Sequence, residues 1–251
     1  MARSSNSSAS SLGQSAYLRL RSDLLSGKLA PGIKLKIADL AESHGISSAG
    51  IREALSRLAA EGLAIAEPQK GFRATPLSEV ELRDLTMVRS RIEGLCLERA
   101  IELGDLAWEA DIAAAIHRLS RVPEQAADRE PAFGVAWSAA HAAFHASLVA
   151  ACDSPWLLRL RDQLWWHSER YRQASVAVAG EARDIRKEHE DLAAAVLARE
   201  VRRAVTLMET HLKLTAESLL ARVHFQPAHE DNAEAMPIGR LIASAGGLLS
   251  S

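Results

Sequence analysis

The segment from Ile37 to Gly62 constrains the fold of this chain more than any other part of the sequence. A short amphipathic helix is predicted to end at Gly45, because glycine adopts the positive φ of a helix C-cap at little cost. A second helix begins at once after Ser47, a good N-cap residue. Its apolar residues recur at helical spacing: Ile51, Ala54, Leu55 and Leu58. This pattern predicts a helix-turn-helix, whose second helix enters the DNA major groove.

The residues after this helix pair predict a β-hairpin. Two short β-prone runs flank a turn that contains Pro68 and ends at Gly71. An ordinary corner between two helices would share the glycine turn, but the hairpin favours a winged helix-turn-helix. A first amphipathic helix should pack behind it. The small core is expected to contain Leu18, Leu20, Leu24, Leu25, Leu35, Ile37, Leu40, Ile51, Leu55 and Leu58.

Several motifs of this region occur in a characteristic order. They are Gly27-Lys-Leu-Ala-Pro-Gly32, Leu40-Ala41, Ile51-Arg-Glu-Ala-Leu55, Arg57-Leu58, Glu61-Gly-Leu63 and Gly71. Together they resemble the winged helix-turn-helix of the GntR family of bacterial transcription regulators, from about Leu18 to Pro76. The resemblance implies a homodimer that binds a double-stranded DNA operator with two-fold symmetry.

The start of the second helix departs from the family pattern. Members of the FadR-like branch usually have Ser-Arg-Thr-Pro there, whereas this chain has Ser47-Ser-Ala-Gly50. Because the base-reading arginine is absent at position 48, Arg52 is the guanidinium left for a bidentate contact to guanine. For Lys34 and Lys36, in the loop before the helix pair, phosphate contact and plain solvation are equal alternatives. The candidate DNA-binding residues are Lys36, Ser47, Ser48, Arg52, Arg57, Lys70, Gly71 and Arg73.

Charge is unevenly distributed along the 251 residues. Residues 1–76 contain 10 Lys+Arg and 6 Asp+Glu, a net charge of +4, whereas the remainder has −6. Since duplex DNA attracts positive charge whatever its sequence, the basic part fits DNA binding. Cys96 and Cys152 are too few for a disulfide framework, and no run approaches the ~18 apolar residues of a membrane span. We therefore expect a cytoplasmic protein without membrane contact.

The chain divides into four parts. Residues 1–12 are a Ser-rich stretch expected to be disordered, residues 13–76 form the winged helix-turn-helix, and residues 225–251 read as a flexible tail. Between them, residues 77–224 begin with the capping box of Ser78 and Glu81 and keep a helical period without a convincing strand. Helices are expected over about 78–104, 105–121, 131–152, 155–178, 180–198 and 200–223. The fold class is thus mostly α, with an antiparallel all-α bundle of about six helices after the head.

Four histidines of the bundle have the spacing of metal ligands. His141 and His145 are four residues apart, so both rings project from one side of a helix. By itself such a pair is more often a core or surface coincidence. His189 and His211 lie on two further helical segments, and four imidazoles meeting at one point would hold a transition ion.

The resemblance to the GntR family continues in the region of these histidines. The motifs Arg89-Ser-Arg-Ile-Glu93, Phe144-His145, Glu188-His189 and His211-Leu212 resemble the FCD effector domain of the FadR branch. Many members of that branch hold a metal there through one Asp and three His. The three His correspond to His145, His189 and His211, and His141 stands where the Asp is usual. An all-histidine site shifts preference from Mg and Mn toward a divalent transition metal, with Zn expected first and Ni second.

The resemblance further implies a small carboxylate effector near this site. Arg89 is the candidate carboxylate clamp, and a surface pair of Arg89 with Glu93 is an equal alternative. Arg170 and Tyr171, on a helix expected to border the cavity, complete the candidate effector residues, although packing or interface roles also suit them.

Two other functions compete with a ligand-responsive regulator. One is a metal-free helical dimerisation module that carries a DNA-binding head. The other is a metal-dependent hydrolase, which needs a general base near the metal. The helix of His141 and His145 supplies none, since alanines surround the pair, and Glu188 and Glu190 are the remaining candidates for a base. A non-enzymatic function is therefore expected.

Overall fold

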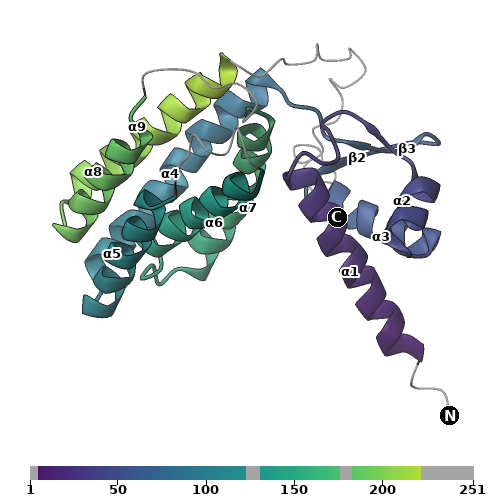
Figure 1. Cartoon of the computed structure of the whole chain (residues 1–251), viewed down its shortest axis with the longest axis horizontal. Helices are drawn as coiled ribbons and strands as arrows, with labels where there is room; N and C mark the ends of the chain where they lie inside the picture. Colours follow the sequence, from purple (N-terminus) through teal and green to yellow (C-terminus); the bar gives the residue numbers. More distant parts are fainter. Residues whose placement is uncertain (1–4, 123–130, 176–182, 222–251) are drawn as a thin grey trace, which may run out of the picture.

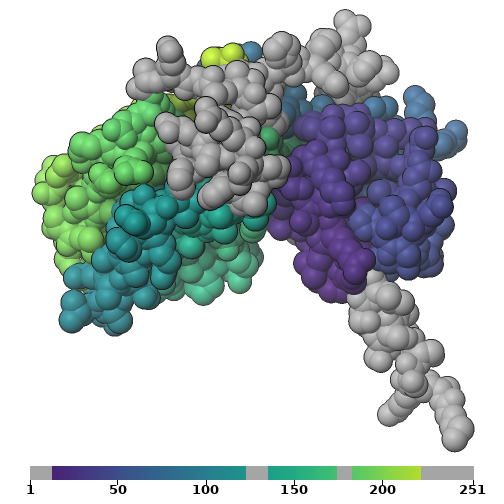
Figure 2. All heavy atoms as spheres, in the orientation of Figure 1, coloured from purple at the N-terminus to yellow at the C-terminus, as the bar shows by residue number. Residues whose placement is uncertain are grey.

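The computed structural model describes residues 5–122, 131–175 and 183–221, so the tail expected over 225–251 lies outside the described part. A helical bundle and a smaller head lie side by side (Figure 1). In the space-filling view they form two lobes with a notch between their lower ends (Figure 2). No helix among the described residues is long and apolar enough to cross a membrane.

The head is a winged helix-turn-helix, as the sequence predicts. Its elements are α1 (Ser5–Leu25), β1 (Lys34–Leu35), α2 (Ile37–His44), α3 (Ser48–Ala60), β2 (Ala64–Glu67) and β3 (Gly71–Ala74). The three strands form an antiparallel sheet in the order β1-β3-β2, with Ile65 opposite Arg73. Strand β1 was not predicted, because two residues are too short to show an alternating pattern.

Local signals fix the helix-turn-helix. Gly45 has φ 63° and caps α2, and the Ser47 side chain accepts a hydrogen bond from the backbone N–H of Gly50 at 3.2 Å. Behind this pair, the fully buried Leu20 of α1 packs in one core with Ile51, Leu55 and Leu58 of α3.

Two expectations about the first helix were wrong. Helix α1 begins at Ser5, within the stretch predicted as a disordered tail over 1–12. Leu18 is 54% exposed, because the buried face of α1 follows Ala16, Leu20 and Leu24 at four-residue spacing. Residue 18 lies on the opposite side of the helix from these positions.

The bundle follows the six predicted helical segments closely. Its helices are α4 (Glu79–Leu103), α5 (Leu106–Ser120), α6 (Pro131–Leu148), α7 (Pro155–Ser175), α8 (Ile185–Leu197) and α9 (Val201–Leu220). Ser78 caps α4, since its side chain accepts from the backbone N–H of Glu81. Helix α4 packs against both α7 and α9. Ion pairs of Glu81 with Arg170 and of Glu93 with Arg161 show that α4 and α7 are antiparallel.

The C-terminal half of α7 joins the bundle to the head. The Tyr171 hydroxyl lies within hydrogen-bond distance of the backbone N and O of Ser78 and of the Glu81 carboxylate. Arg170 donates to Glu81 at 3.3 Å and to the carbonyl of Gly62 at 3.4 Å. The polar groups of Arg170 and Tyr171 are thus hydrogen-bonded at the linker between the head and the bundle. The structure gives no support to the prediction that Arg170 and Tyr171 bind an effector.

Two further contacts join α7 to the head. The guanidinium of Arg21 lies 4.8 Å from the ring centroid of Trp166. Gly62, which has φ 74°, approaches the ring of His167 so closely that a Cβ atom there would lie 3.3 Å from the imidazole. The head is therefore held against α7 by a cation–π contact, a hydrogen bond and a close backbone approach.

We expect Tyr171→Phe to loosen this junction. The substitution removes a hydroxyl that satisfies Ser78 and Glu81, at a cost of about 1–2 kcal/mol. Limited proteolysis should then cleave the linker over residues 75–78 faster than in the wild type. Tyr17→Phe is the matched control, because the Tyr17 hydroxyl donates to Glu61 at 2.6 Å within the head. Equal linker cleavage in Tyr171→Phe and wild type would contradict the assigned role.

Candidate metal centre and DNA-binding surface

The four predicted histidines meet inside the bundle. His141 and His145 project from α6, His189 from α8 and His211 from α9, and all four are buried. Each offers one ring nitrogen such that the four atoms lie within 4.8 Å of one another. The Nε2 atoms of His145 and His189 are 3.3 Å apart. A group of this size and composition matches the ligand set of one transition ion.

The rings also have the electronic state that metal binding needs. Burial lowers the pKa of His141 and His145 well below the usual 6.5, and neighbouring imidazoles and arginines lower it further. Burial likewise lowers the pKa of His189 to about 3. The Nδ1 atoms of His141 and His145 are buried without a hydrogen-bond partner. Neutral rings with unsatisfied nitrogens fit a bound cation, so the residues present suit a metal.

A carboxylate orients one of the rings from outside the cluster. Glu188 lies 2.8 Å from Nδ1 of His211 and is also bound by Arg183. Burial opposes charge on Glu188, but the hydrogen bonds from His211 and Arg183 outweigh it and lower its pKa to about 2. Because an ionised carboxylate only accepts, Nδ1 of His211 carries the proton and Nε2 is left with a lone pair.

Neither of the two carboxylates considered as a general base for a hydrolase is placed for that role in the part of the chain that the structure describes. Glu188 is committed to His211 and Arg183, and a carboxyl group with a pKa of about 2 is a weak proton acceptor. Glu190, the other candidate, is exposed, and as the next residue along α8 it projects about 100° away from the buried His189.

A buried group of charges adjoins the histidines through Trp165. The Trp165 ring lies 5.6 Å from His141 and 5.2 Å from His145 between centroids, and 4.6 Å from the guanidinium of Arg89. Arg89 pairs with Glu93 at 3.4 Å, but both are buried, so the alternative of a surface pair was wrong. Glu93 is shared with Arg161 at 3.1 Å.

Arg89 retains unused hydrogen-bonding capacity. Its Nε has no partner, and burial lowers the pKa of its guanidinium. Arg161 also pairs with Asp162 at 3.1 Å, and the charge of Glu169 opposes the lowering of the pKa of Arg89. The group that an anionic ligand would satisfy is therefore the unpartnered Nε of Arg89.

A cavity of about 370 Å³ lies beside the histidines, between α5, α6 and α8. His189 and Trp137 line it, and the Trp137 ring is stacked on His141 at 4.6 Å between centroids. Arg183 and Arg186 line the same cavity. Asp184 is the one acidic lining residue, so the cavity is polar and carries more positive than negative side chains next to the histidine cluster.

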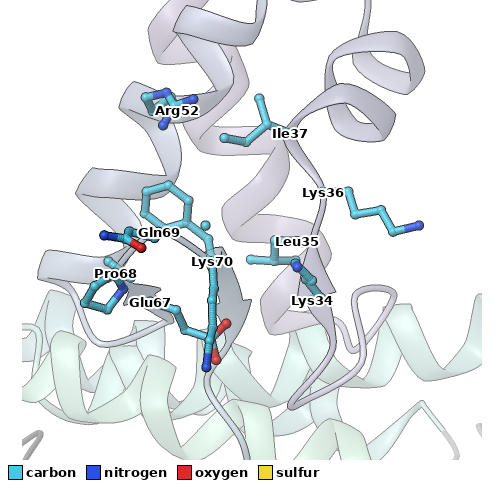
Figure 3. A pocket seen from close by; sticks show the side chains of 12 residues that line it. Lys34, Leu35, Lys36, Ile37, Arg52, Glu67, Pro68, Gln69 and Lys70 are labelled. Carbon is cyan, nitrogen blue, oxygen red and sulfur yellow. The ribbon is translucent and has the colours of Figure 1, made fainter.

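Four of the predicted DNA-binding residues line one groove of the head. The groove has a volume of about 580 Å³ and lies between α3, β1 and the wing. It is lined by Lys36, Arg52, Lys70 and Gly71, together with Lys34 and Gln69. Figure 3 shows Arg52 on the helix above the wing residues, with Lys34 and Lys36 on the other side. Among the residues that line the groove, cationic side chains outnumber the single acidic residue, Glu67, so the groove suits the phosphate backbone of DNA.

Other predicted DNA-binding residues have structural partners. Arg57 donates to Gln14 at 3.0 Å and stacks on Tyr17 at 4.0 Å, which ties α3 to α1. Arg73 pairs with Glu67 and donates to the carbonyl of Gly32 at 2.6 Å.

The two serines before α3 differ in their environment. Ser47 uses its hydroxyl oxygen as the N-cap of the helix. Ser48, exposed in the first turn, is left facing solvent.

Sequence reasoning missed several residues around both sites. The partners of Arg161 and Arg183 lie 68 and 32 residues away, so helical periodicity gave no signal for these two arginines. Trp137 stacks on His141 from four residues earlier on α6, a spacing that could have indicated it. In the head, sequence reasoning missed Gln69, a turn residue with φ 61° that lines the groove.

Comparisons with known proteins agree with this architecture. Residues 12–73 match the family described as bacterial regulatory proteins, gntR family, and residues 84–214 match the FCD domain. The HTH-type regulator BphR of Paraburkholderia xenovorans (strain LB400) is 35% identical over 203 residues, which cover 81% of this chain and 83% of that protein. The HTH-type repressor GlaR of Escherichia coli (strain K12) is 36% identical over 200 residues, which cover 78% and 90%.

A solved structure supports the fold as a whole. The E. coli protein McbR/YncC superposes with a TM-score of 0.69 at 20% identity and covers 84% of this chain and 97% of its own. The winged head, the helical bundle and both family matches lead to one conclusion: the chain belongs to the GntR family of bacterial transcription regulators, with an FCD domain, and is a DNA-binding transcription regulator of that type.

Proposed function

We propose that this regulator binds a metal ion and a small carboxylate in its helical domain and thereby changes its affinity for a DNA operator. The observation that supports this most strongly is the convergence of four buried, neutral histidines. Such a group is costly to bury without a partner, since two ring nitrogens are unsatisfied.

The donor set favours zinc, with nickel second. Four imidazoles and no carboxylate suit borderline transition ions better than magnesium or manganese, which prefer oxygen ligands. A bound divalent ion would keep its full positive charge among neutral rings and so attract an anionic ligand. His141, His145, His189 and His211 would hold it, and Glu188 would orient His211.

Arg89 is the proposed second anchor for the acid. The guanidinium of Arg89 contacts the same Trp165 ring that His141 and His145 contact, and its Nε has no hydrogen-bond partner. A carboxylate between the histidine cluster and Arg89 would meet positive charge on both sides.

Helix α7 offers a direct route from this site to the head. Trp165 contacts the histidines, and the next residues, Trp166 and His167, contact Arg21 and Gly62. A shift of Trp165 on ligand binding would therefore change how the head packs against α7. Coupling of this kind is typically about 1–3 kcal/mol, or about 5- to 150-fold in affinity. Because the relative GlaR is named a repressor, we propose that this protein also represses transcription.

The first prediction concerns the metal. Protein purified without an affinity tag should contain about one zinc or nickel per chain by elemental analysis, and a chelator should lower its melting temperature. His145→Asn, which replaces the imidazole with a smaller neutral amide, should lose most of the metal, whereas the exposed His117→Asn should keep it. Full folding with no metal in the wild type would favour the metal-free dimerisation module.

The second prediction concerns the acid. In calorimetric titrations with a panel of small carboxylates, Arg89→Gln should weaken binding by about 10- to 100-fold, the cost of losing a charged hydrogen bond. Metal content should stay unchanged, and the exposed Arg118→Gln should behave as wild type. The same acid should alter operator affinity in gel shifts. An acid that binds without altering operator affinity would refute the regulatory proposal.

The third prediction concerns the groove. On an operator selected from random duplexes or from genomic footprints, Arg52→Ala should cost about 1–3 kcal/mol and relax sequence preference if Arg52 contacts a base. Lys70→Ala should weaken binding evenly across sequences and reduce the salt dependence by about one ion. Arg118→Ala, an exposed arginine of the bundle, is the control. Unchanged operator affinity in both Arg52→Ala and Lys70→Ala would exclude the groove as the DNA-binding surface.

A further inference from the structure

Helix α4 exposes an apolar stripe that neither site uses. Of the thirteen large hydrophobic side chains that are exposed among the described residues, five belong to this one helix. Four of the five are Val80 (78% exposed), Met87 (59%), Val88 (38%) and Leu95 (46%). Their spacing of seven, one and seven residues places them on one face of the helix, opposite the buried Leu82 and Glu93.

Two opposite charges lie on the same face. Asp84 and Arg91 are exposed between the apolar residues, and neither makes an ion pair among the residues that the structure describes. Arg91 influences Glu209 on α9 only weakly, since Lys213 is the main cause of the lowered pKa of that carboxyl. Both charges are therefore available to a partner.

The stripe has the symmetry of a helix that pairs with itself. Its midpoint falls between Met87 and Val88, and the pattern is the same in both directions from that point. If two copies of α4 cross antiparallel there, Val80 faces Leu95 of the other copy and Met87 faces its Val88. Asp84 then faces Arg91 of the other copy, and the ion pair forms twice.

We propose that two copies of this chain dimerise through α4, with the two-fold axis near Met87 and Val88. In an isologous contact, charges at equal distances from the two-fold axis face each other and must therefore be opposite in sign. Binding to an unrelated partner would not depend on this symmetry. From Val80 to Leu95 the stripe is about 22 Å long at the rise of an α-helix. The apolar residues supply the buried area, and the charge pairs fix the antiparallel register.

This inference goes beyond the proposed function, because it assigns a surface and a register to the dimer. It rests on the proposed function, with the operator bound by the homodimer that the family resemblance implies, and is independent of metal and acid. Helix α4 follows the wing after only residues 75–78, so an axis through α4 also relates the two heads. Two heads related in this way can read the half-sites of a two-fold operator.

Charge reversal tests the register. In sedimentation experiments, Asp84→Arg and Arg91→Asp should each raise the dimer dissociation constant at least about tenfold, because each creates two like-charge contacts. The double variant D84R/R91D should restore dimerisation. A mixture of the two single variants should form heterodimers, since every facing pair is then of opposite charge.

A matched control is present on α5. Asp111 and Arg118 are also exposed, seven residues apart and without an ion pair among the described residues. Asp111→Arg and Arg118→Asp should leave the dimer unchanged. Circular dichroism should show the same helix content in all of these variants.

Cross-linking gives a second, independent test. Under oxidation the double variant V80C/L95C should form interchain disulfides, because the two positions face each other in the dimer. V80C or L95C alone should not, since identical positions would lie about 22 Å apart. The native Cys96 and Cys152 are buried.

Two results would overturn the proposal. One is a D84R variant that dimerises like the wild type, which would place the interface elsewhere but leave the operator-binding dimer intact. The other is a monomeric wild-type protein at all concentrations, which would also contradict the dimer of the proposed function. The metal and acid titrations would be unaffected by either result.

Discussion

The desolvation of four imidazoles is the constraint on which the rest of the helical domain depends. Burial keeps His141, His145 and His189 neutral, and the carboxylate of Glu188 reaches only the outer nitrogen of His211. Among the residues that the structure describes, no acidic side chain belongs to the cluster itself. The cluster is therefore a set of lone pairs without its own countercharge, and buried arginines beside it add positive charge. These features together favour a cation and an anion as joint occupants.

Helix α7 connects the histidine cluster to the head. Within a few residues it contacts the histidines through Trp165 and the head through Trp166, His167 and Arg170. A rigid helix transmits displacement along its length because its backbone hydrogen bonds resist local bending. The linker at Ser78 is bound to the same helix through Tyr171. Both covalent and non-covalent connections between the two parts thus converge on α7.

Local sequence signals predicted the elements well, and long-range partners poorly. Gly45, Ser47 and Ser78 mark helix ends through interactions with residues three or four positions away, and the structure confirms all three. Spacing also predicted that the histidines share an interior face. The partners of Arg57 and Arg170 are 43 and 89 residues away, and periodicity specifies only the face from which a side chain projects. For that reason the sequence did not indicate that Arg170 and Tyr171 lie at the junction with the head.

The close approach of Gly62 to His167 has a consequence for the divergence of such regulators. Any larger side chain at position 62 would meet both an unfavourable backbone angle and the imidazole ring. The substitution would alter neither the groove of the head nor the histidine cluster. A lineage could thus change how firmly its head is held against the bundle through one codon, while the groove and the histidine cluster are inherited unchanged.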